Sequence, residues 1–136
     1  MEKKHDMKSN EYQTPPEVAE YMASLMPEGV YEVLEPTKGN GNLYRAIGKE
    51  LDDREYRAYH ITAPDDFFLM DQKKLFDCVI MNPPFSTKSA VINNAPVELH
   101  NSGMLIGYYI LQQCMLKSRS IIALMPWFTI IDSDVR

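Results

Sequence analysis

Residues 76–85, FDCVIMNPPF, decide how this chain is interpreted, because an apolar run is followed at once by a rigid turn. The run Phe76–Met81 predicts a buried strand, and Asn82-Pro83-Pro84 ends it. A residue before proline is pushed into extended backbone, so Asn82 and Pro83 are both held extended. Neither proline has an N–H, and the turn therefore presents carbonyl oxygens without competing donors.

This turn suits a ligand that carries a planar amino group. The Asn82 side-chain oxygen and the Pro83 carbonyl can together accept from an –NH2 group, and Phe85 offers a face on which the attached ring can stack. Such a site would favour a nucleophilic amine without a charged base. The alternative is a proline-rich turn that only ends a strand. We take Asn82, Pro83, Pro84 and Phe85 as the candidate catalytic residues.

A second turn follows an earlier strand. Val30–Leu34 predicts a short buried strand, Glu35-Pro36 ends it, and Gly39-Asn40-Gly41 leads into a helix. The two glycines allow a tight turn and a close approach of a ligand to the helix N-terminus. The acid at the strand end favours a ligand with a positive group, such as the ammonium of an amino acid. Tyr44 stands where the dinucleotide fingerprint has a third glycine, and an ordinary Gly-rich turn remains the alternative.

The remaining pattern alternates strands and helices. It predicts an open parallel sheet with helices on its faces, and ligands in such sheets bind outside the carboxyl ends of the strands. The first helix is expected to begin at Thr14-Pro15-Pro16-Glu17, with Thr14 as its cap and Glu17 completing a capping box. The other expected elements are a helix from Asn42, a strand over Tyr56–Thr62, a weaker strand over Phe67–Met70, a loop over Ser86–Gly103, a helix over Met104–Leu116 and a last strand over Ile121–Met125.

Composition and charge narrow the class of protein. The 136 residues include 14 Lys+Arg and 19 Asp+Glu, a formal charge of -5, and 45% are hydrophobic, which is typical of one soluble domain. No apolar run approaches the roughly 18 residues of a membrane span, and residues 1–10 are too charged for a secretory signal. Cys78 and Cys114 lack metal-ligand spacing and favour a reducing, cytoplasmic setting. We expect a flexible segment over residues 1–10 and one catalytic core over 11–136.

The turn at Asn82-Pro83-Pro84-Phe85 resembles the catalytic motif of the S-adenosylmethionine-dependent amino-methyltransferases, above all the adenine-specific DNA methyltransferases. Other segments agree in order and spacing over about residues 11–131. Residues 12–19 look like the N-terminal helix motif of type I modification subunits, and residues 34–43 match the cofactor loop. Asp65-Asp66-Phe67-Phe68 is similar to the family's Asp-Phe segment at the third strand. Residues 121–128 fit its fifth strand.

The resemblance implies a Rossmann-like methyltransferase fold with a mostly parallel open sheet and helices on both faces. It implies transfer of a methyl group from S-adenosyl-L-methionine to the exocyclic amine of adenine in DNA, as in restriction-modification. The residues expected to hold the cofactor are Thr14, Glu35, Pro36, Gly39, Gly41 and Asp66, with Phe67 packing near its adenine. The target adenine, flipped out of the duplex, is expected to lie against Asn82, Pro83 and Phe85.

The chain departs from the family pattern in three places. His60 stands where the family has an acid that binds the ribose hydroxyls, and only Ala63-Pro64 separates the second strand from Asp65-Asp66, so one helix is expected to be missing. The family's last strands and its recognition domain are also expected to be absent. We therefore expect a second chain, or a C-terminal continuation, to cover the edge at Ile121–Met125.

Three functions stay open. The first is an adenine DNA methyltransferase core that acts with a partner. The second is a degenerate methyltransferase-like module that binds partners or DNA without catalysis. His60 and the missing helix favour this hypothesis. The third keeps the chemistry and changes the substrate, since Asn-Pro-Pro-aromatic motifs also serve RNA bases and protein glutamine. The acidic balance argues against tight DNA binding by charge alone.

Overall fold

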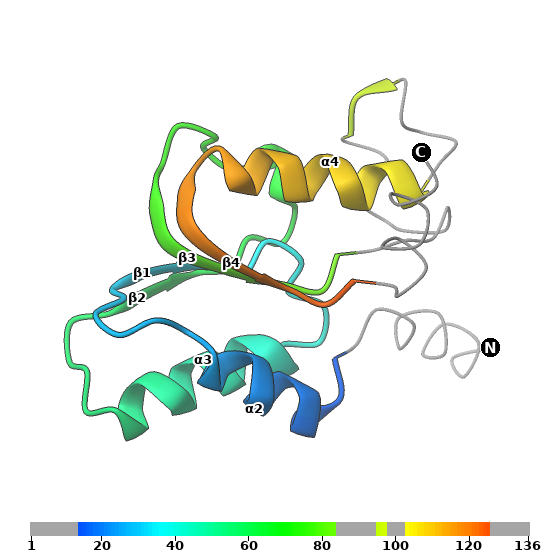
Figure 1. The fold of residues 1–136 in the computed structure, drawn as a ribbon. Helices are drawn as coiled ribbons and strands as arrows, with labels where there is room; N and C mark the ends of the chain where they lie inside the picture. Colours follow the sequence, from blue (N-terminus) through cyan, green and yellow to red (C-terminus); the bar gives the residue numbers. More distant parts are fainter. Residues whose placement is uncertain (1–13, 84–94, 98–102, 126–136) are drawn as a thin grey trace, which may run out of the picture.

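The computed structural model describes residues 14–83, 95–97 and 103–125. In this part of the chain, four strands form one sheet in the order β2-β1-β3-β4, and every neighbouring pair is parallel. Helices α2 and α3 cover one face and α4 covers the other (Figure 1). The predicted α/β class and parallel sheet are confirmed. The bounds are α2 Pro16–Ser24, β1 Glu32–Leu34, α3 Asn42–Asp53, β2 His60–Thr62, β3 Phe76–Met81, α4 Gly103–Met115 and β4 Ser118–Ala123.

Of the two helices on the lower face in Figure 1, α3 forms as predicted and α2 does not begin as predicted. The cap of α2 is Pro15, Pro16 is its first residue, and no side chain caps it. The capping box of Thr14 and Glu17 is therefore wrong, because the Thr14 hydroxyl bonds to Asn82 instead. Helix α3 begins at Asn42 and buries the apolar positions expected of it, namely Leu43, Ala46, Ile47 and Leu51.

Four of the predicted strands differ from the structure. The expected third strand, Phe67–Met70, is instead a short 3-10 helix (η1, Phe67–Leu69), because the Asp66 side chain accepts the Phe68 backbone N–H and caps that turn. Strands β1 and β2 are shorter than predicted. Strand β4 begins three residues earlier and ends two residues earlier than the predicted Ile121–Met125, and its register places Ser118 opposite Phe76. It forms one edge of the described sheet.

The sheet separates two apolar cores, as a sheet with both faces covered requires. Val33 and Cys78 belong to the core under α2 and α3, whereas the next residue of β1, Leu34, belongs to the core under α4. This alternation follows the pleat of the strand. Both cysteines are fully buried, which confirms that they are core residues. The buried side chains that α4 contributes are Ile106, Ile110 and Cys114.

The central pairing, β1 with β3, joins the two halves of the chain. Val33 is in register with Cys78 and Leu34 with Val79. At the amino end of this pair, the carboxylate of Asp77 accepts the backbone N–H groups of Tyr31 and Glu32, at 2.8 and 2.9 Å. A side chain of β3 therefore satisfies donors at the start of β1, which extends the pairing beyond the ladder itself.

Helix α3 ends in a Schellman motif whose left-handed residue is not glycine. The Tyr56 N–H bonds to the Leu51 carbonyl at 3.0 Å, and the Glu55 N–H bonds to the Asp52 carbonyl at 2.9 Å. Glu55 has φ 65°, a conformation in which L side chains are strained. Within residues 14–83, 95–97 and 103–125, no helix has the length and apolarity needed to cross a bilayer.

Candidate functional site

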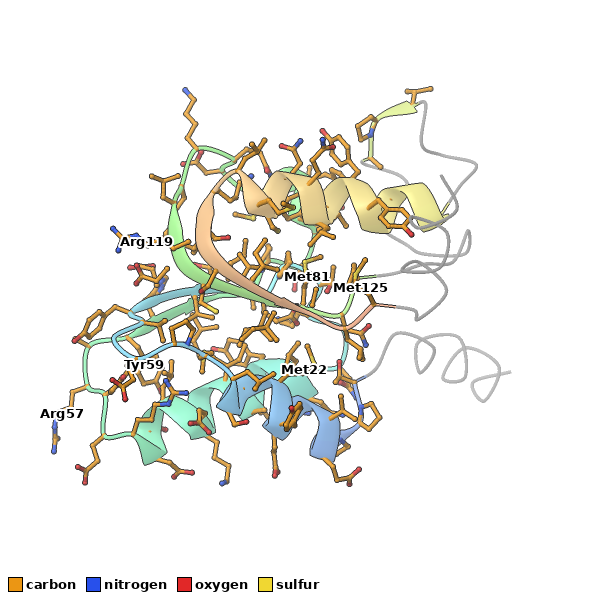
Figure 2. The ribbon with its side chains drawn as sticks, viewed as in Figure 1. Met22, Arg57, Tyr59, Met81, Arg119 and Met125 are labelled. Carbon is orange, nitrogen blue, oxygen red and sulfur yellow. The ribbon has the colours of Figure 1, made fainter. Side chains whose placement is uncertain are left out.

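The predicted site residues gather at the carboxyl edge of the sheet. Glu35 directly follows β1, Asn82 directly follows β3, and Thr14 lies just before α2. In Figure 2 this edge is marked by Met81, the last residue of β3, and by Met125, two residues after β4, which lie on the same side of the molecule. Pro84 and Phe85 lie outside the described residues. The structure therefore describes the first half of the predicted catalytic turn, Asn82-Pro83, and the residues around it.

Glu35 is a buried acid with one unpartnered oxygen. The residue is 1% exposed. Its Oε1 accepts the Thr37 backbone N–H at 2.8 Å and lies 3.2 Å from the Thr37 hydroxyl. Its Oε2 is buried and has no hydrogen-bond partner in the described part of the chain. Burial raises the pKa of Glu35 from 4.5 to about 7, against the lowering effect of the Thr37 hydrogen bonds. An orphan carboxylate oxygen of this kind is a place for a cationic or donor group of a ligand.

The glycine loop shapes the entrance to α3. Gly39 and Gly41 have φ 56° and 90°, and Gly41 is the cap of the helix. The positive φ favours glycine at Gly41, and a Cβ there would lie 2.9 Å from the Arg45 guanidinium, so this flexible side chain would have to move. Pro36, between Glu35 and this loop, is fully buried. The expected glycine turn between β1 and α3 is therefore formed by the residues that the sequence indicated, and its binding of a cofactor stays a prediction.

Asn82 has a defined side-chain orientation. Its Nδ2 donates to the Thr14 hydroxyl at 3.1 Å, which leaves Oδ1 as the atom that can accept from a ligand. Thr14 is 4% exposed, and its carbonyl accepts from the Asn42 Nδ2 at 2.9 Å. Pro83 is buried and has no N–H to compete for the acceptors. The structure therefore leaves the acceptor end of the Asn82 side chain without a bond to Thr14, and the role of Asn82 and Pro83 toward a planar amino group stays a prediction.

The end of β2 differs from the prediction. His60 begins the strand rather than ending it, is 62% exposed, and lies 3.4 Å from Glu32 Oε1 at the opposite edge of the sheet. The proposal that His60 occupies the ribose position is therefore wrong, because the strand extends two residues beyond it. The strand ends at Thr62, whose carbonyl accepts the Glu35 N–H at 2.9 Å. The Thr62 hydroxyl is buried without a partner among the described residues.

The segment after β2 brings Asp66 and Phe67 to the same region, in roles that are structural in this state. Asp66 Oδ1 accepts the Phe68 N–H at 2.9 Å and starts η1. Phe67 is 1% exposed and packs in the core between the sheet and α4, with the Lys117 ammonium 5.4 Å from its ring centre. Between β2 and β3 the chain has only this 3-10 helix, so the expected absence of an α-helix there is confirmed.

Two residues of the site were missed from the sequence, Thr37 and Thr62. Thr37 bonds to Glu35 and also to the backbone carbonyl of Asn82, at 3.2 Å. Thr37 could have been found from the strand register. Leu34 pairs with Val79, and continuing this register three residues past that pair places Thr37 opposite Asn82. Thr62 could have been found only with the correct end of β2, which an exposed, weakly apolar strand does not reveal.

One pocket lies outside the candidate site. An open pocket lined by Asp52, Glu55, Tyr56, Arg57 and Tyr59 lies away from the candidate site; in Figure 2, Arg57 and Tyr59 lie far from Met81 and Met125. The described residues contain no cluster of His, Cys, Asp and Glu side chains arranged to hold a metal ion. Comparison with protein-family models, with curated proteins and with solved structures gave no match.

Proposed function

We propose that this chain is the catalytic core of a methyltransferase that modifies the exocyclic amine of adenine in DNA with S-adenosyl-L-methionine as cofactor. The observation that carries the proposal is the pairing of two features at one edge of the sheet. Asn82 presents its Oδ1 after the end of β3, and the neighbouring strand β1 is followed by Glu35, a buried acid with an unpartnered oxygen. One feature suits an amine substrate and the other a cationic ligand. The Rossmann-like sheet order is compatible with this function.

The residues present fit the proposed cofactor. S-adenosyl-L-methionine carries an ammonium group and a sulfonium, and Glu35 Oε2 is an anionic acceptor without a partner in the described residues. Gly39 and Gly41 contribute no side chains to the adjacent loop. Thr62 offers a second unpartnered buried atom at the neighbouring strand end. When bound, the cofactor supplies an electrophilic methyl group.

The chain's own contribution is to orient the substrate amine. Asn82 Oδ1 and the carbonyl of Pro83 are acceptors, and an –NH2 group that donates to both is held in one plane. Because these acceptors are neutral and fixed before the substrate binds, they lower the cost of localising the amine lone pair. Removing the Asn82 amide is therefore expected to reduce the rate by 10²-fold or more while the protein stays folded.

The proposal includes a partner. DNA affinity from phosphate contacts requires cationic side chains, and the chain has a formal charge of -5. We therefore assign the DNA-reading surface to another chain or region, which would also cover the edge formed by β4. Size-exclusion chromatography with candidate partner subunits tests this part, and active, sequence-specific methylation by the isolated monomer would contradict it.

Cofactor binding is the first experiment. Isothermal titration with S-adenosyl-L-methionine should show binding to the wild-type chain, and Glu35→Gln should weaken it because the amide cannot pair with an ammonium. Asn82→Ala is the matched control, since it removes the amine acceptor and leaves the carboxylate in place. No heat of binding at millimolar cofactor would overturn the proposal.

Substrate class is the second experiment. Transfer of a labelled methyl group should be measured to adenine-containing DNA, to RNA and to a glutamine-containing protein extract. We expect label in DNA, with loss in Asn82→Ala. Label only in RNA or in glutamine would replace the DNA substrate, because any planar amino group fits the acceptors of Asn82 and Pro83. Cofactor binding without transfer to any of the three would favour a module that has lost catalysis.

A further inference from the structure

A single hydroxyl lies between the two parts of the site. The Thr37 Oγ1 is 3.2 Å from Glu35 Oε1 and 3.2 Å from the backbone oxygen of Asn82. Both neighbours are acceptors when Glu35 is ionised, and a threonine hydroxyl has one proton to donate. The hydroxyl can therefore make one full hydrogen bond, either to the acid after β1 or to the catalytic turn after β3.

The carboxylate holds this proton in the ligand-free, ionised state. A hydrogen bond to a charged oxygen is about twice as strong as one to a neutral carbonyl. The Thr37 backbone N–H also points to Oε1, at 2.8 Å, which keeps the carboxylate beside the hydroxyl. The second oxygen, Oε2, has no partner in the described residues, so few hydrogen bonds stabilise the charge of Glu35. The hydrogen bond from the Thr37 hydroxyl to Oε1 is therefore strong.

Neutralising Glu35 reverses this preference. A cationic group at Oε2, or a proton there, lowers the acceptor strength of Oε1, and the hydroxyl proton becomes available to the Asn82 carbonyl. That bond would fix the backbone of Asn82 from one side while the Thr14 hydroxyl fixes its side chain from the other, at 3.1 Å. The turn that receives the substrate amine is then held by both threonines.

We propose that Thr37 is a positioning residue that couples the two halves of the site: a cationic ligand group on Glu35 releases the Thr37 hydroxyl to the Asn82 carbonyl and so fixes the backbone of Asn82 for the amine-bearing substrate. The identity of the two ligands rests on the proposed function, whereas the exchange of the hydrogen bond does not. By linkage, a substrate that orders the turn must tighten the binding of the cationic ligand by the same factor.

The titratable and charged groups around Glu35 determine the pH at which the hydrogen bond is exchanged. Burial raises the pKa of Glu35 to about 7, so a proton can replace the ligand as the neutralising charge. Lys38 favours the ionised form, and it also forms an ion pair with Asp65 at 3.4 Å. Cys114 on α4 interacts with Glu35, but burial raises the pKa of this thiol to about 12, so it stays neutral and does not titrate in the same range.

The exchange can be tested without any ligand. Carbonyl ¹³C shifts of Asn82 and side-chain ¹³C shifts of Glu35 should be followed by NMR from pH 5 to pH 9. In the wild type, both should titrate with one midpoint near 7, and the Asn82 carbonyl should move downfield as the pH falls because it gains a hydrogen bond. Thr37→Ser, which keeps a hydroxyl, should preserve this response.

Thr37→Val is the decisive variant in the same titration. It removes the hydroxyl with little change of shape, so Glu35 should still titrate, at a higher pH, while the Asn82 response disappears. Persistence of the Asn82 response in Thr37→Val, or its absence in a wild type whose Glu35 titrates, would overturn the coupling. Amide spectra and urea unfolding check that each variant is folded.

Ligand binding separates this inference from the proposed function. The affinity for S-adenosyl-L-methionine should be measured with and without an adenine-containing oligonucleotide. We expect the oligonucleotide to raise the affinity at least about fivefold in the wild type and in Thr37→Ser, and by a factor near one in Thr37→Val. Coupling that survives in Thr37→Val would sink the inference and leave the function intact. A wild type that binds no cofactor would sink the function, and the NMR titration would then decide the role of Thr37.

Discussion

The side-chain Nδ2 of Asn82 donates a hydrogen bond of 3.1 Å to the hydroxyl of Thr14, a residue 68 positions earlier in the chain. This bond joins the segment before α2 to the turn after β3. It also selects which end of the Asn82 amide faces a ligand, because the donor end is occupied. Thr14, which the family resemblance assigns to the cofactor, is thus in direct contact with the catalytic turn.

Thr14→Val should separate these two roles. Loss of the hydroxyl leaves the Asn82 amide free to rotate, so we expect methyl transfer to fall about 10- to 100-fold while the dissociation constant of the cofactor changes less than about twofold. Thr14→Ser should restore the rate because it keeps the hydroxyl. Single-turnover kinetics and calorimetry measure the two quantities. Weaker binding of the cofactor with an unchanged rate of methyl transfer would instead indicate that Thr14 contacts the cofactor.

Glu35→Gln should remove a pH dependence of stability. The folded-state pKa of about 7 lies above the unfolded value of 4.5, so the folded protein binds a proton more tightly than the unfolded chain. Stability from this group is complete below pH 4.5 and is lost as the pH rises toward 7, a change on the order of 3 kcal/mol. Urea unfolding of wild type and Glu35→Gln at pH 5 and pH 8 checks this. If the free energies of unfolding of the two proteins differ by the same amount at pH 5 and at pH 8, Glu35 is not a buried carboxylate with a raised pKa.

Asp77→Ala should weaken the central pairing of the sheet. The carboxylate accepts two backbone N–H bonds at the start of β1, and its loss is expected to cost about 2 kcal/mol of the free energy of unfolding. These bonds lower the pKa of Asp77 below 3.8, so their contribution is present above that pH and disappears as the pH falls through the folded-state value. Asp77→Asn, which keeps one acceptor oxygen, should cost less. Denaturant titration at pH 7 and pH 3 measures both effects, and an equal cost at the two pH values would argue against the charge.

Glu55→Gly should stabilise the protein. Glu55 occupies the left-handed position of the Schellman motif with φ 65°, where glycine is free of Cβ strain. The expected gain is about 1 kcal/mol, after the greater freedom of glycine in the unfolded chain is subtracted. Glu55→Ala is the control, because it removes the carboxylate and keeps the Cβ. Thermal unfolding should show a higher midpoint for the glycine variant alone; a gain in both would point to charge rather than backbone strain.

Residues with strong local signals were predicted correctly. The mostly apolar run of Phe76–Met81 gave β3 with its bounds, and the helical spacing after Asn42 gave α3 with its buried face. The turns at Glu35 and Asn82 were placed at strand ends because proline and glycine mark them. These elements are determined by their own sequence, and tertiary contacts only reinforce them.

Elements that depend on distant partners were predicted poorly. The cap expected at Thr14 failed because its hydroxyl bonds to a residue 68 positions away. The strand expected at Phe67–Met70 failed because Asp66 caps a 3-10 turn there. The assignment of His60 failed because β2 is only three residues long and its register with β1 fixes where it ends. The contacts of Thr14 and of β2 are long-range and leave no local pattern, whereas the Asp66 cap is local and was hidden by the apolar run that follows it.

The pairing of β1 with β3 determines how the molecule can open locally. One contiguous stretch carries β1, α3 and β2, a second carries β3, α4 and β4, and the two meet along β1 and β3. Glu35 belongs to the first stretch and Asn82 to the second, so parting of the two separates them even while each stretch keeps its own strand pairs. The fraction of molecules with an assembled site is then set by the free energy of this local opening rather than by global unfolding, and amide protection along β1 reports it.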